Sequence, residues 1–154
     1  MISIADTLTA DRIGLALEAS DHRAAIRAVA DLLQSAEEVL DWEELCESLR
    51  GSCPCLAEGG GDFAICLPHA RTDTVHAMVM SAGRFDDGIA FPGCAQRVRY
   101  VFCIGVPRAL ESDYLRILGL LARVLKEPEA EGVLRHAETP ADFIACLSAL
   151  EAKL

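Results

Sequence analysis

One apolar run that stops at a proline, a histidine and an arginine constrains the fold of this chain more than any other feature. Residues 63–67 are five apolar side chains in a row, and Pro68, His69, Ala70 and Arg71 follow directly. A short apolar run without polar alternation predicts a strand that is buried on both faces. Proline cannot donate a hydrogen bond within a sheet, so we expect the strand to stop there and to present His69 at its end.

The amino-acid composition favours helices packed on a sheet. Of the 154 residues, 52% are hydrophobic and only 5% are aromatic, so aliphatic side chains must fill the interior. A chain of this length can bury a sizeable core without disulfides. No repeat, low-complexity segment or interdomain linker interrupts it, and we therefore expect residues 1–154 to form a single α/β domain.

Apolar residues spaced by three and four predict the helices. The clearest pattern begins at Asp21, whose side chain is suited to cap a helix, and the next begins at Asp41 for the same reason. We expect helices over residues 22–36, 41–50 and 112–126, one that opens at Pro128 and a last one that opens at the capping box of Thr139.

Four segments predict strands, namely residues 13–17, 63–67, 74–81 and 97–104. Between the second helix and the second strand, residues 51–61 hold four glycines and a proline, which predicts a loop. The predicted order of elements is therefore β-α-α-β-β-β-α-α-α.

The net charge excludes some classes of partner. With 24 acidic and 14 basic residues the formal charge is −10, which repels nucleic acid and anionic lipid and leaves a basic protein partner plausible. The amino terminus has no leader pattern, and no apolar stretch reaches the roughly 18 residues of a spanning helix. We expect a cytoplasmic protein without membrane insertion.

Seven cysteines in a reducing compartment predict free thiols. Cys66, Cys94, Cys103 and Cys146 lie in or beside apolar runs, where cysteine behaves as a small buried hydrophobe.

The segment Ala64-Ile65-Cys66-Leu67-Pro68-His69-Ala70-Arg71 resembles the fructose/mannitol-type enzyme IIA domains of the bacterial phosphotransferase system, a family that includes the nitrogen-regulatory IIA proteins. The likeness extends to residues 21–36 and 45–50, to Gly-Ile-Ala-Phe at 88–91 and to a strand that ends in Gly-Val-Pro at 105–107. This resemblance implies a three-layer α/β/α sandwich with a mixed sheet.

The resemblance also implies a reaction for His69. In the family, the equivalent histidine accepts a phosphoryl group from the phosphocarrier protein HPr and passes it to an enzyme IIB, or regulates other proteins through its phosphorylation state. A neutral imidazole suits both directions of transfer because its pKa lies close to ambient pH. The ring nitrogen that does not attack should donate a hydrogen bond, but the sequence does not identify the acceptor. No cofactor is expected.

Three side chains are candidates to bind the phosphoryl group, namely Arg50, Arg71 and Tyr114. Arg50 matches the family's arginine at the end of the second helix. Many family members carry a second histidine where this chain has Tyr114, and a phenol can donate a hydrogen bond but cannot titrate near pH 7. This departure favours a regulatory member of the family.

Two alternatives stay open. The chain could be a regulatory protein-binding module of the same fold with weak or no onward phosphotransfer. More remotely, Cys53, Cys55, Cys66 and His69 offer thiolates and an imidazole to zinc, although their spacing matches no common zinc site. The other histidines predict ordinary roles: His76 in the core or facing a partner, and His22 and His136 in solvent.

Overall fold

A mixed β-sheet runs through the centre of the molecule. The computed structural model describes residues 3–51, 55–56 and 63–154. Within these ranges six strands pair in the order β1-β5-β6-β3-β2, and β4 also pairs with β6. The long β5 and β6 are antiparallel, whereas β3 and β4 both run parallel to β6, one after the other along it. The strands are β1 Ile13–Gly14, β2 Cys55–Leu56, β3 Phe63–Cys66, β4 His69–Arg71, β5 Val79–Ile89 and β6 Arg97–Val106.

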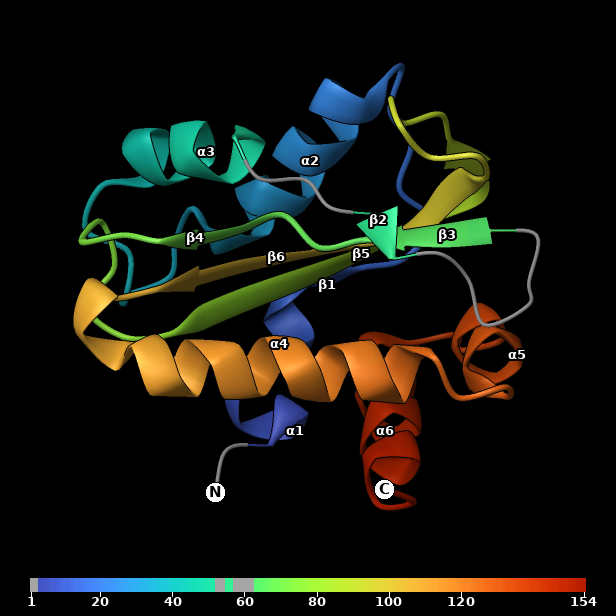
Figure 1. Ribbon diagram of the computed structural model, residues 1–154. Coiled ribbons are helices and arrows are strands. Elements are labelled where there is room, and N and C mark those ends of the chain that lie inside the picture. The colour runs from blue at the N-terminus through green and yellow to red at the C-terminus, as the bar shows by residue number, and fades with distance from the viewer. Residues whose placement is uncertain (1–2, 52–54, 57–62) are drawn as a thin grey trace.

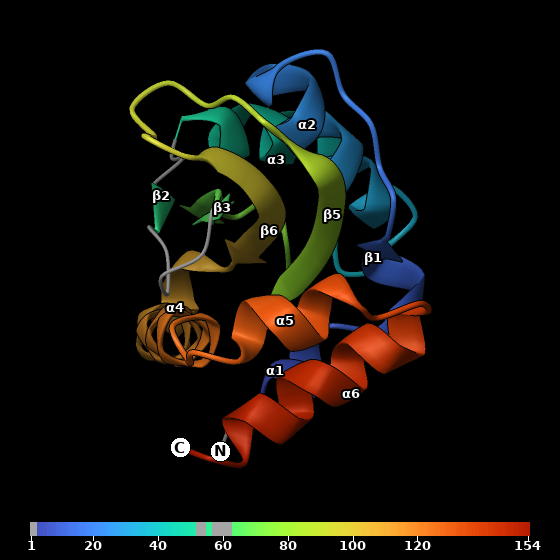
Figure 2. The ribbon, with the colours of Figure 1, turned by 90° about the vertical axis from the view of Figure 1, so that its right-hand side faces the viewer.

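Helices cover both faces of this sheet (Figure 1). On one face lie α2 (His22–Ala30) and α3 (Trp42–Arg50), and the other helices lie on the opposite face. Figure 2 shows the sheet between these two layers, which confirms the predicted three-layer α/β/α arrangement with a mixed sheet. The helices of the second layer are α1 Ile4–Thr7, α4 Glu111–Leu125, α5 Ala130–Arg135 and α6 Pro140–Glu151.

Strand β6 separates two hydrophobic cores. Its side chains alternate, so that Tyr100, Phe102 and Ile104 pack toward α4 and α6 while Val101 and Cys103 pack toward α2 and α3. All five are at most 2% exposed, as expected for a strand with a helical layer on each face.

The predicted helix caps are confirmed at three helices. Asp21 accepts a hydrogen bond from the amide of Ala24, Asp41 from that of Glu44, and Thr139 from that of Asp142. The first helix is shorter than predicted, however. It ends at Ala30 and continues as a single 3₁₀ turn, Asp31–Leu33.

The strand predicted over residues 74–81 exists, but its bounds are wrong. Residues 74–78 form a turn that backbone hydrogen bonds and an isolated bridge between Val39 and Val75 join to residues 38–41, and the strand is β5, which begins at Val79. The second half of β5 contains charged residues, so its sequence lacks the apolar pattern expected of a buried strand. Arg84 is nevertheless buried, because it pairs with Asp86 and donates to the carbonyl oxygens of Leu134 and Ala137.

Other elements also differ from prediction, among them the helix expected to open at Pro128, which begins at Ala130 as α5. The first strand stops at Gly14 because Ala16 takes a left-handed conformation, with φ of 58°. The predicted loop over 51–61 contains β2, which pairs with β3, and its remaining residues beyond Gly51 lie outside the described part of the chain. The short α1 was not predicted. That one domain spans residues 1–154 stays a prediction.

Two features bear on cysteine and membrane expectations. Cys66 and Cys103 are buried as predicted, and Cys46 and Cys146 are free thiols. The prediction of a free thiol is wrong for Cys94, which is half-buried and disulfide-bonded.

In the described ranges, every helix is too short or too polar to cross a bilayer.

Candidate functional site

His69 lies where two strand segments meet. Strand β3 ends at Cys66, Leu67 and Pro68 leave the ladder, and β4 resumes pairing with β6 at His69, opposite Ile104. The amide of Ile104 still donates to the carbonyl oxygen of Pro68 at 2.9 Å, so the backbone stays attached to β6 through the proline. Pro68 therefore interrupts the strand without releasing the histidine from the sheet.

A backbone carbonyl fixes the proton on the imidazole of His69. Its Nδ1 lies 2.7 Å from the carbonyl oxygen of Leu67. A carbonyl oxygen can only accept a hydrogen bond, so Nδ1 donates and carries the proton. In the neutral ring Nε2 then holds the lone pair, which is the arrangement that a nucleophilic imidazole requires. The acceptor that the sequence could not identify is thus the residue two positions earlier.

Tyr114 lies beside this imidazole. The two ring centroids are 5.6 Å apart and the ring planes are inclined by 52°. Tyr114 belongs to the first turn of α4, which follows β6 in the chain and brings the phenol to the end of β3. Burial raises the pKa of Tyr114, with a smaller opposing effect from the nearby charge of Arg71. The phenol is therefore a hydrogen-bond donor throughout the neutral range.

Arg71 supplies a positive charge on the same side. It is the last residue of β4, and its Nη1 lies 2.6 Å from Oε1 of Glu111 at the start of α4. The side chains of this pair are 42% and 62% exposed, so the pair itself contributes little to stability. Its effect is to orient the guanidinium toward the helix that carries Tyr114. Sequence reasoning missed Glu111, because nothing in its local pattern distinguishes it from other solvated carboxylates.

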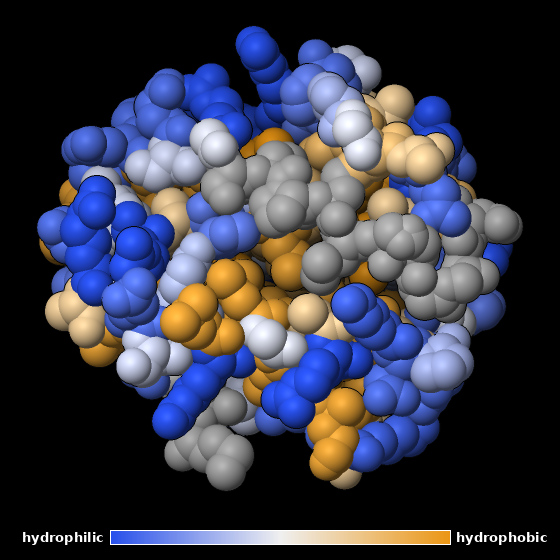
Figure 3. Space-filling view, viewed as in Figure 1, coloured by the Kyte–Doolittle hydropathy of each residue, from blue (hydrophilic) through white to orange (hydrophobic). Residues whose placement is uncertain are grey.

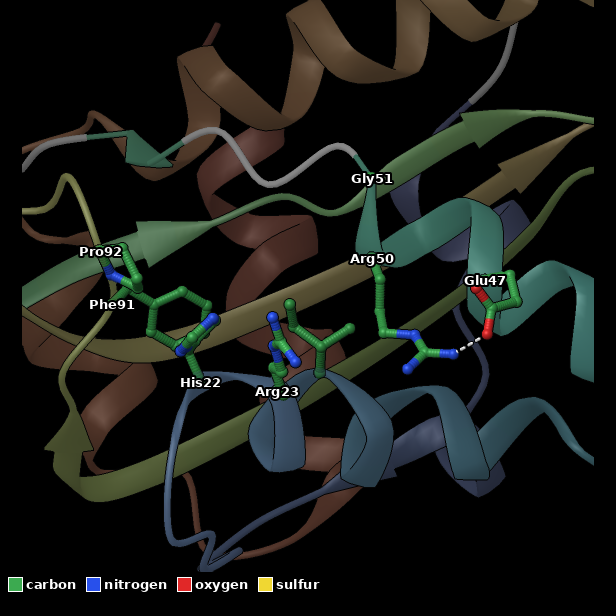
Figure 4. Close-up of a pocket in the computed structure, with 8 residues that line it drawn as sticks. His22, Arg23, Glu47, Arg50, Gly51, Phe91 and Pro92 are labelled. Atoms are coloured by element: carbon green, nitrogen blue, oxygen red, sulfur yellow. Dashed lines mark hydrogen bonds and ion pairs between the residues drawn. The ribbon is translucent and has the colours of Figure 1, made fainter.

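The third candidate, Arg50, lies elsewhere. At the end of α3 its guanidinium forms an ion pair with Glu47, and it lines a cavity of about 520 Å³ together with the start of α2 (Figure 4). Among the described residues that line this cavity, His69 is absent. The structure thus brings His69, Tyr114 and Arg71 together, while the prediction that Arg50 binds the phosphoryl group stays a prediction.

The remaining histidines differ in part from expectation. His136 is exposed as predicted. His76 is exposed too, and lies in a turn rather than a strand. The prediction that His22 is solvated is wrong, because it is partly buried with its ring 5.6 Å from that of Phe91.

The zinc alternative gains no support. Cys53 lies outside the described residues, and Cys66 is fully buried in the core under α2 and α3. Over residues 3–51, 55–56 and 63–154, no group of three or more histidine, cysteine or acidic side chains is arranged to hold a metal ion.

Comparison with known proteins identifies the family of this chain. Residues 6–149 match the model for the family described as phosphoenolpyruvate-dependent sugar phosphotransferase system, EIIA 2. The chain belongs to this family. The match confirms the resemblance that the segment around His69 suggested.

One curated relative and two solved structures illustrate the likeness. The fructose-specific EIIA component of Haloferax volcanii is 34% identical over 84 residues, which cover 54% of this chain and 54% of that protein. The chain thus spans about half the length of this curated relative. The crystal structure of nitrogen regulatory protein IIA-Ntr from Neisseria meningitidis superposes with a TM-score of 0.82 at 20% identity, covering 94% of this EIIA chain and 98% of that one.

The second structure is a complex of mannitol enzyme IIA with phosphorylated enzyme IIB from Escherichia coli. It matches with a TM-score of 0.74 at 17% identity and covers 93% of this chain and 98% of that one. At these identities the two structures confirm the fold of the EIIA chain and no more.

Proposed function

We propose that this chain is a phosphohistidine carrier of the phosphotransferase system, which accepts a phosphoryl group on Nε2 of His69 from an HPr-like phosphocarrier protein. Membership of the EIIA family supports a carrier role. The observation that carries the assignment to His69 is its imidazole, with Nδ1 held by Leu67 and the ring beside Tyr114. The fixed tautomer leaves Nε2 as the nucleophile.

The transfer is a displacement at phosphorus. The lone pair of Nε2 attacks the phosphorus of the donor's phosphohistidine, the new N–P bond forms, and the donor's N–P bond breaks with its electron pair returning to the donor imidazole. His69 acquires a positive charge shared by both ring nitrogens, which the carbonyl of Leu67 stabilises through the proton on Nδ1. Onward transfer reverses these steps with an acceptor in place of the donor.

Two side chains are placed to stabilise the phosphoryl oxygens. The phenol of Tyr114 can donate one hydrogen bond, and Arg71 adds a positive charge close to it. Both groups act by electrostatics and neither exchanges a proton during transfer, which suits a reaction with little covalent chemistry for the protein to perform.

The proposed partner surface includes the start of α4. Apolar side chains gather over α4 among charged ones (Figure 3), and Leu110 and Leu115 at its start are 38% and 61% exposed. Exposed leucines next to Tyr114 suit the apolar centre of a protein interface. The acidic excess of the chain favours a basic carrier such as an HPr-like protein, and the mannitol IIA complex suggests an enzyme IIB as the next acceptor.

A regulatory binding module is the second candidate, and Tyr114 favours it. A phenol whose pKa is raised by burial cannot take over the proton exchange of a second histidine near neutral pH. On this view His69 is phosphorylated as a signal, or not at all, and the chain acts by docking to a target protein.

One experiment separates these candidates. The protein is incubated with enzyme I, HPr and phosphoenolpyruvate, and its intact mass is measured before and after acid treatment. A carrier gains one acid-labile phosphoryl group, which His69→Ala abolishes, and then loses it to an added enzyme IIB. A phosphorylated protein that retains the group supports the regulatory module, and an adduct that persists in His69→Ala contradicts both assignments to His69.

A further inference from the structure

A second site lies between α2 and α3, on the opposite face of the sheet from α4. A cavity of about 520 Å³ opens between the start of α2, the end of α3 and the segment of Phe91 and Pro92 (Figure 4). This volume is within the range of small-molecule sites, roughly 300–1,000 Å³. Neither His69, Tyr114 nor Arg71 is among the described residues that line it.

Positive charge gathers in this cavity although the chain as a whole is acidic. Arg23 comes from α2 and Arg50 from α3, and Figure 4 shows Arg23 between His22 and Arg50 along the cavity. The only carboxylate among the described lining residues is Glu47, which pairs with Arg50. Two guanidinium groups against one carboxylate leave a local positive charge in a protein of net charge −10. Such a pocket attracts an anion that the remaining surface repels.

Arg23 is exposed, and of the two arginines that line the cavity it is the one without an ion pair among the described residues. The neighbouring Arg27 pairs with Asp31 and Glu43, and Arg50 pairs with Glu47. Within the described part of the chain, Arg23 forms no ion pair or hydrogen bond. A guanidinium presents a rigid fork of donors that fits two oxygens of a phosphate, so Arg23 is suited to bind one.

The floor of the cavity is apolar. Ile26 and Phe91 line it and are 3% and 5% exposed, and the ring of His22 lies 5.6 Å from that of Phe91 at one end. A simple inorganic anion would use the arginines and leave this floor uncovered. A molecule with a ring and a phosphate group would use both.

We propose that the cavity between α2 and α3 binds a small organic phosphate of about the size of a phosphosugar, with the phosphate on Arg23 and Arg50 and the ring over Ile26 and Phe91. The site does not depend on the proposed phosphorylation of His69. It gives the chain a place to sense a phosphorylated metabolite on the face away from Tyr114.

The test is a titration of the ¹⁵N-labelled protein with glucose 6-phosphate, inorganic phosphate and glucose, followed by backbone amide shifts. We expect glucose 6-phosphate alone to give saturable shifts at His22, Arg23 and Gly51, with a dissociation constant of about 1 mM or lower. Equal affinity for inorganic phosphate would overturn the role of the apolar floor. No saturable shift with any probe would overturn the site.

Matched variants test the charges. Arg23→Ala should weaken binding by about tenfold, because one charge-assisted contact is lost. Glu47→Gln should strengthen it about threefold by releasing Arg50. Arg123 is an exposed arginine of α4, which lies on the other face of the sheet. Arg123→Ala removes the same charge there and should leave the affinity for glucose 6-phosphate unchanged. Equal losses in Arg23→Ala and Arg123→Ala would show a non-specific charge effect and contradict the site.

His69→Ala separates this inference from the proposed carrier role. The variant cannot carry phosphate on position 69, yet its glucose 6-phosphate titration should match that of the unmodified protein. Loss of binding in His69→Ala would place the ligand at the His69 site and overturn the inference.

Discussion

His69 and His136 make the same kind of hydrogen bond but have different surroundings. Each donates from Nδ1 to a backbone carbonyl oxygen at 2.7 Å, that of Leu67 for His69 and that of Gly132 for His136. Both neutral rings therefore carry the proton on Nδ1 and the lone pair on Nε2. His69 lies at the start of a strand between β3 and α4, whereas His136 is the exposed C-cap of α5.

If His69 is the phosphoryl acceptor, as we propose, the difference implies that a fixed tautomer alone does not make one. The carboxyl end of a helix carries a partial negative charge, so a phosphoryl group on His136 would meet repulsion from the carbonyls of α5. His69 instead has a phenol and a guanidinium on its side of the sheet. We therefore expect the surroundings, more than the imidazole itself, to favour phosphorylation of His69 over His136.

The largest expected effect separates the two histidines directly. His69→Ala should abolish the acid-labile phosphoryl adduct formed with enzyme I, HPr and phosphoenolpyruvate, because the nucleophile is gone. His136→Ala should leave the amount and rate of adduct unchanged. Intact mass spectrometry measures both variants, and an adduct lost in His136→Ala but kept in His69→Ala would reverse the comparison.

We expect the second-largest effect on phosphoryl transfer from changes at Tyr114. Tyr114→Phe keeps the ring beside His69 but deletes the hydroxyl, so we expect phosphoryl acceptance to slow by about tenfold, the value of one hydrogen bond to a charged group. Tyr114→His instead places a group there that titrates near neutral pH, and should speed onward transfer to an enzyme IIB. Rates of adduct gain and loss measure the two steps. Unchanged acceptance in Tyr114→Phe would assign Tyr114 to packing alone.

Elements of the fold that depend on local sequence signals could be predicted well. Caps at Asp21 and Asp41 and apolar periodicity gave the starts of α2 and α3 almost to the residue. Strand β5 was misplaced because its buried Arg84 looks like a surface residue until the carbonyls of Leu134 and Ala137, fifty residues later, accept its hydrogen bonds. No local sequence pattern indicates that residues so far along the chain will accept hydrogen bonds from a buried arginine.

The candidate site, too, could be predicted only in part, because some of its contacts have no local sequence signal. His69 and Arg71 follow a recognisable strand, and the family resemblance supplied Tyr114. The acceptor for Nδ1 is a backbone carbonyl, which every residue carries, so only the conformation around Pro68 decides which carbonyl it is. The placement of Arg50 depended on where the end of α3 turns, and its ion pair with Glu47 is an i,i+3 contact that helical spacing favours.

Arg71 should contribute less than Tyr114. Its side chain is 42% exposed and already paired with Glu111, so solvent screens much of its charge. Arg71→Ala should slow acceptance by about threefold at low salt and less at high salt, whereas Glu111→Gln should leave it unchanged or slightly faster because the guanidinium is released. The salt dependence of the adduct rate is the measurement. A faster rate in Arg71→Ala would show that its charge opposes transfer.

The smallest effect concerns the pKa of Tyr114 itself. Burial raises this pKa and the charge of Arg71 opposes the shift, so Arg71→Ala should raise the pKa further. Because the folded pKa lies above the unfolded one, the contribution to stability is present below pH of about 10 and is lost as the pH rises through the folded value. Ultraviolet difference titration follows the phenol at low salt.

The chain has one other tyrosine, Tyr100, and burial raises its pKa strongly, so Tyr114 should ionise first. Tyr114→Phe should remove that first step and keep the later one. An unchanged midpoint in Arg71→Ala would mean that the guanidinium does not act on the phenol. Arg71 would then have no electrostatic role beside His69, and the contrast with His136 would depend on Tyr114 and the helix end alone.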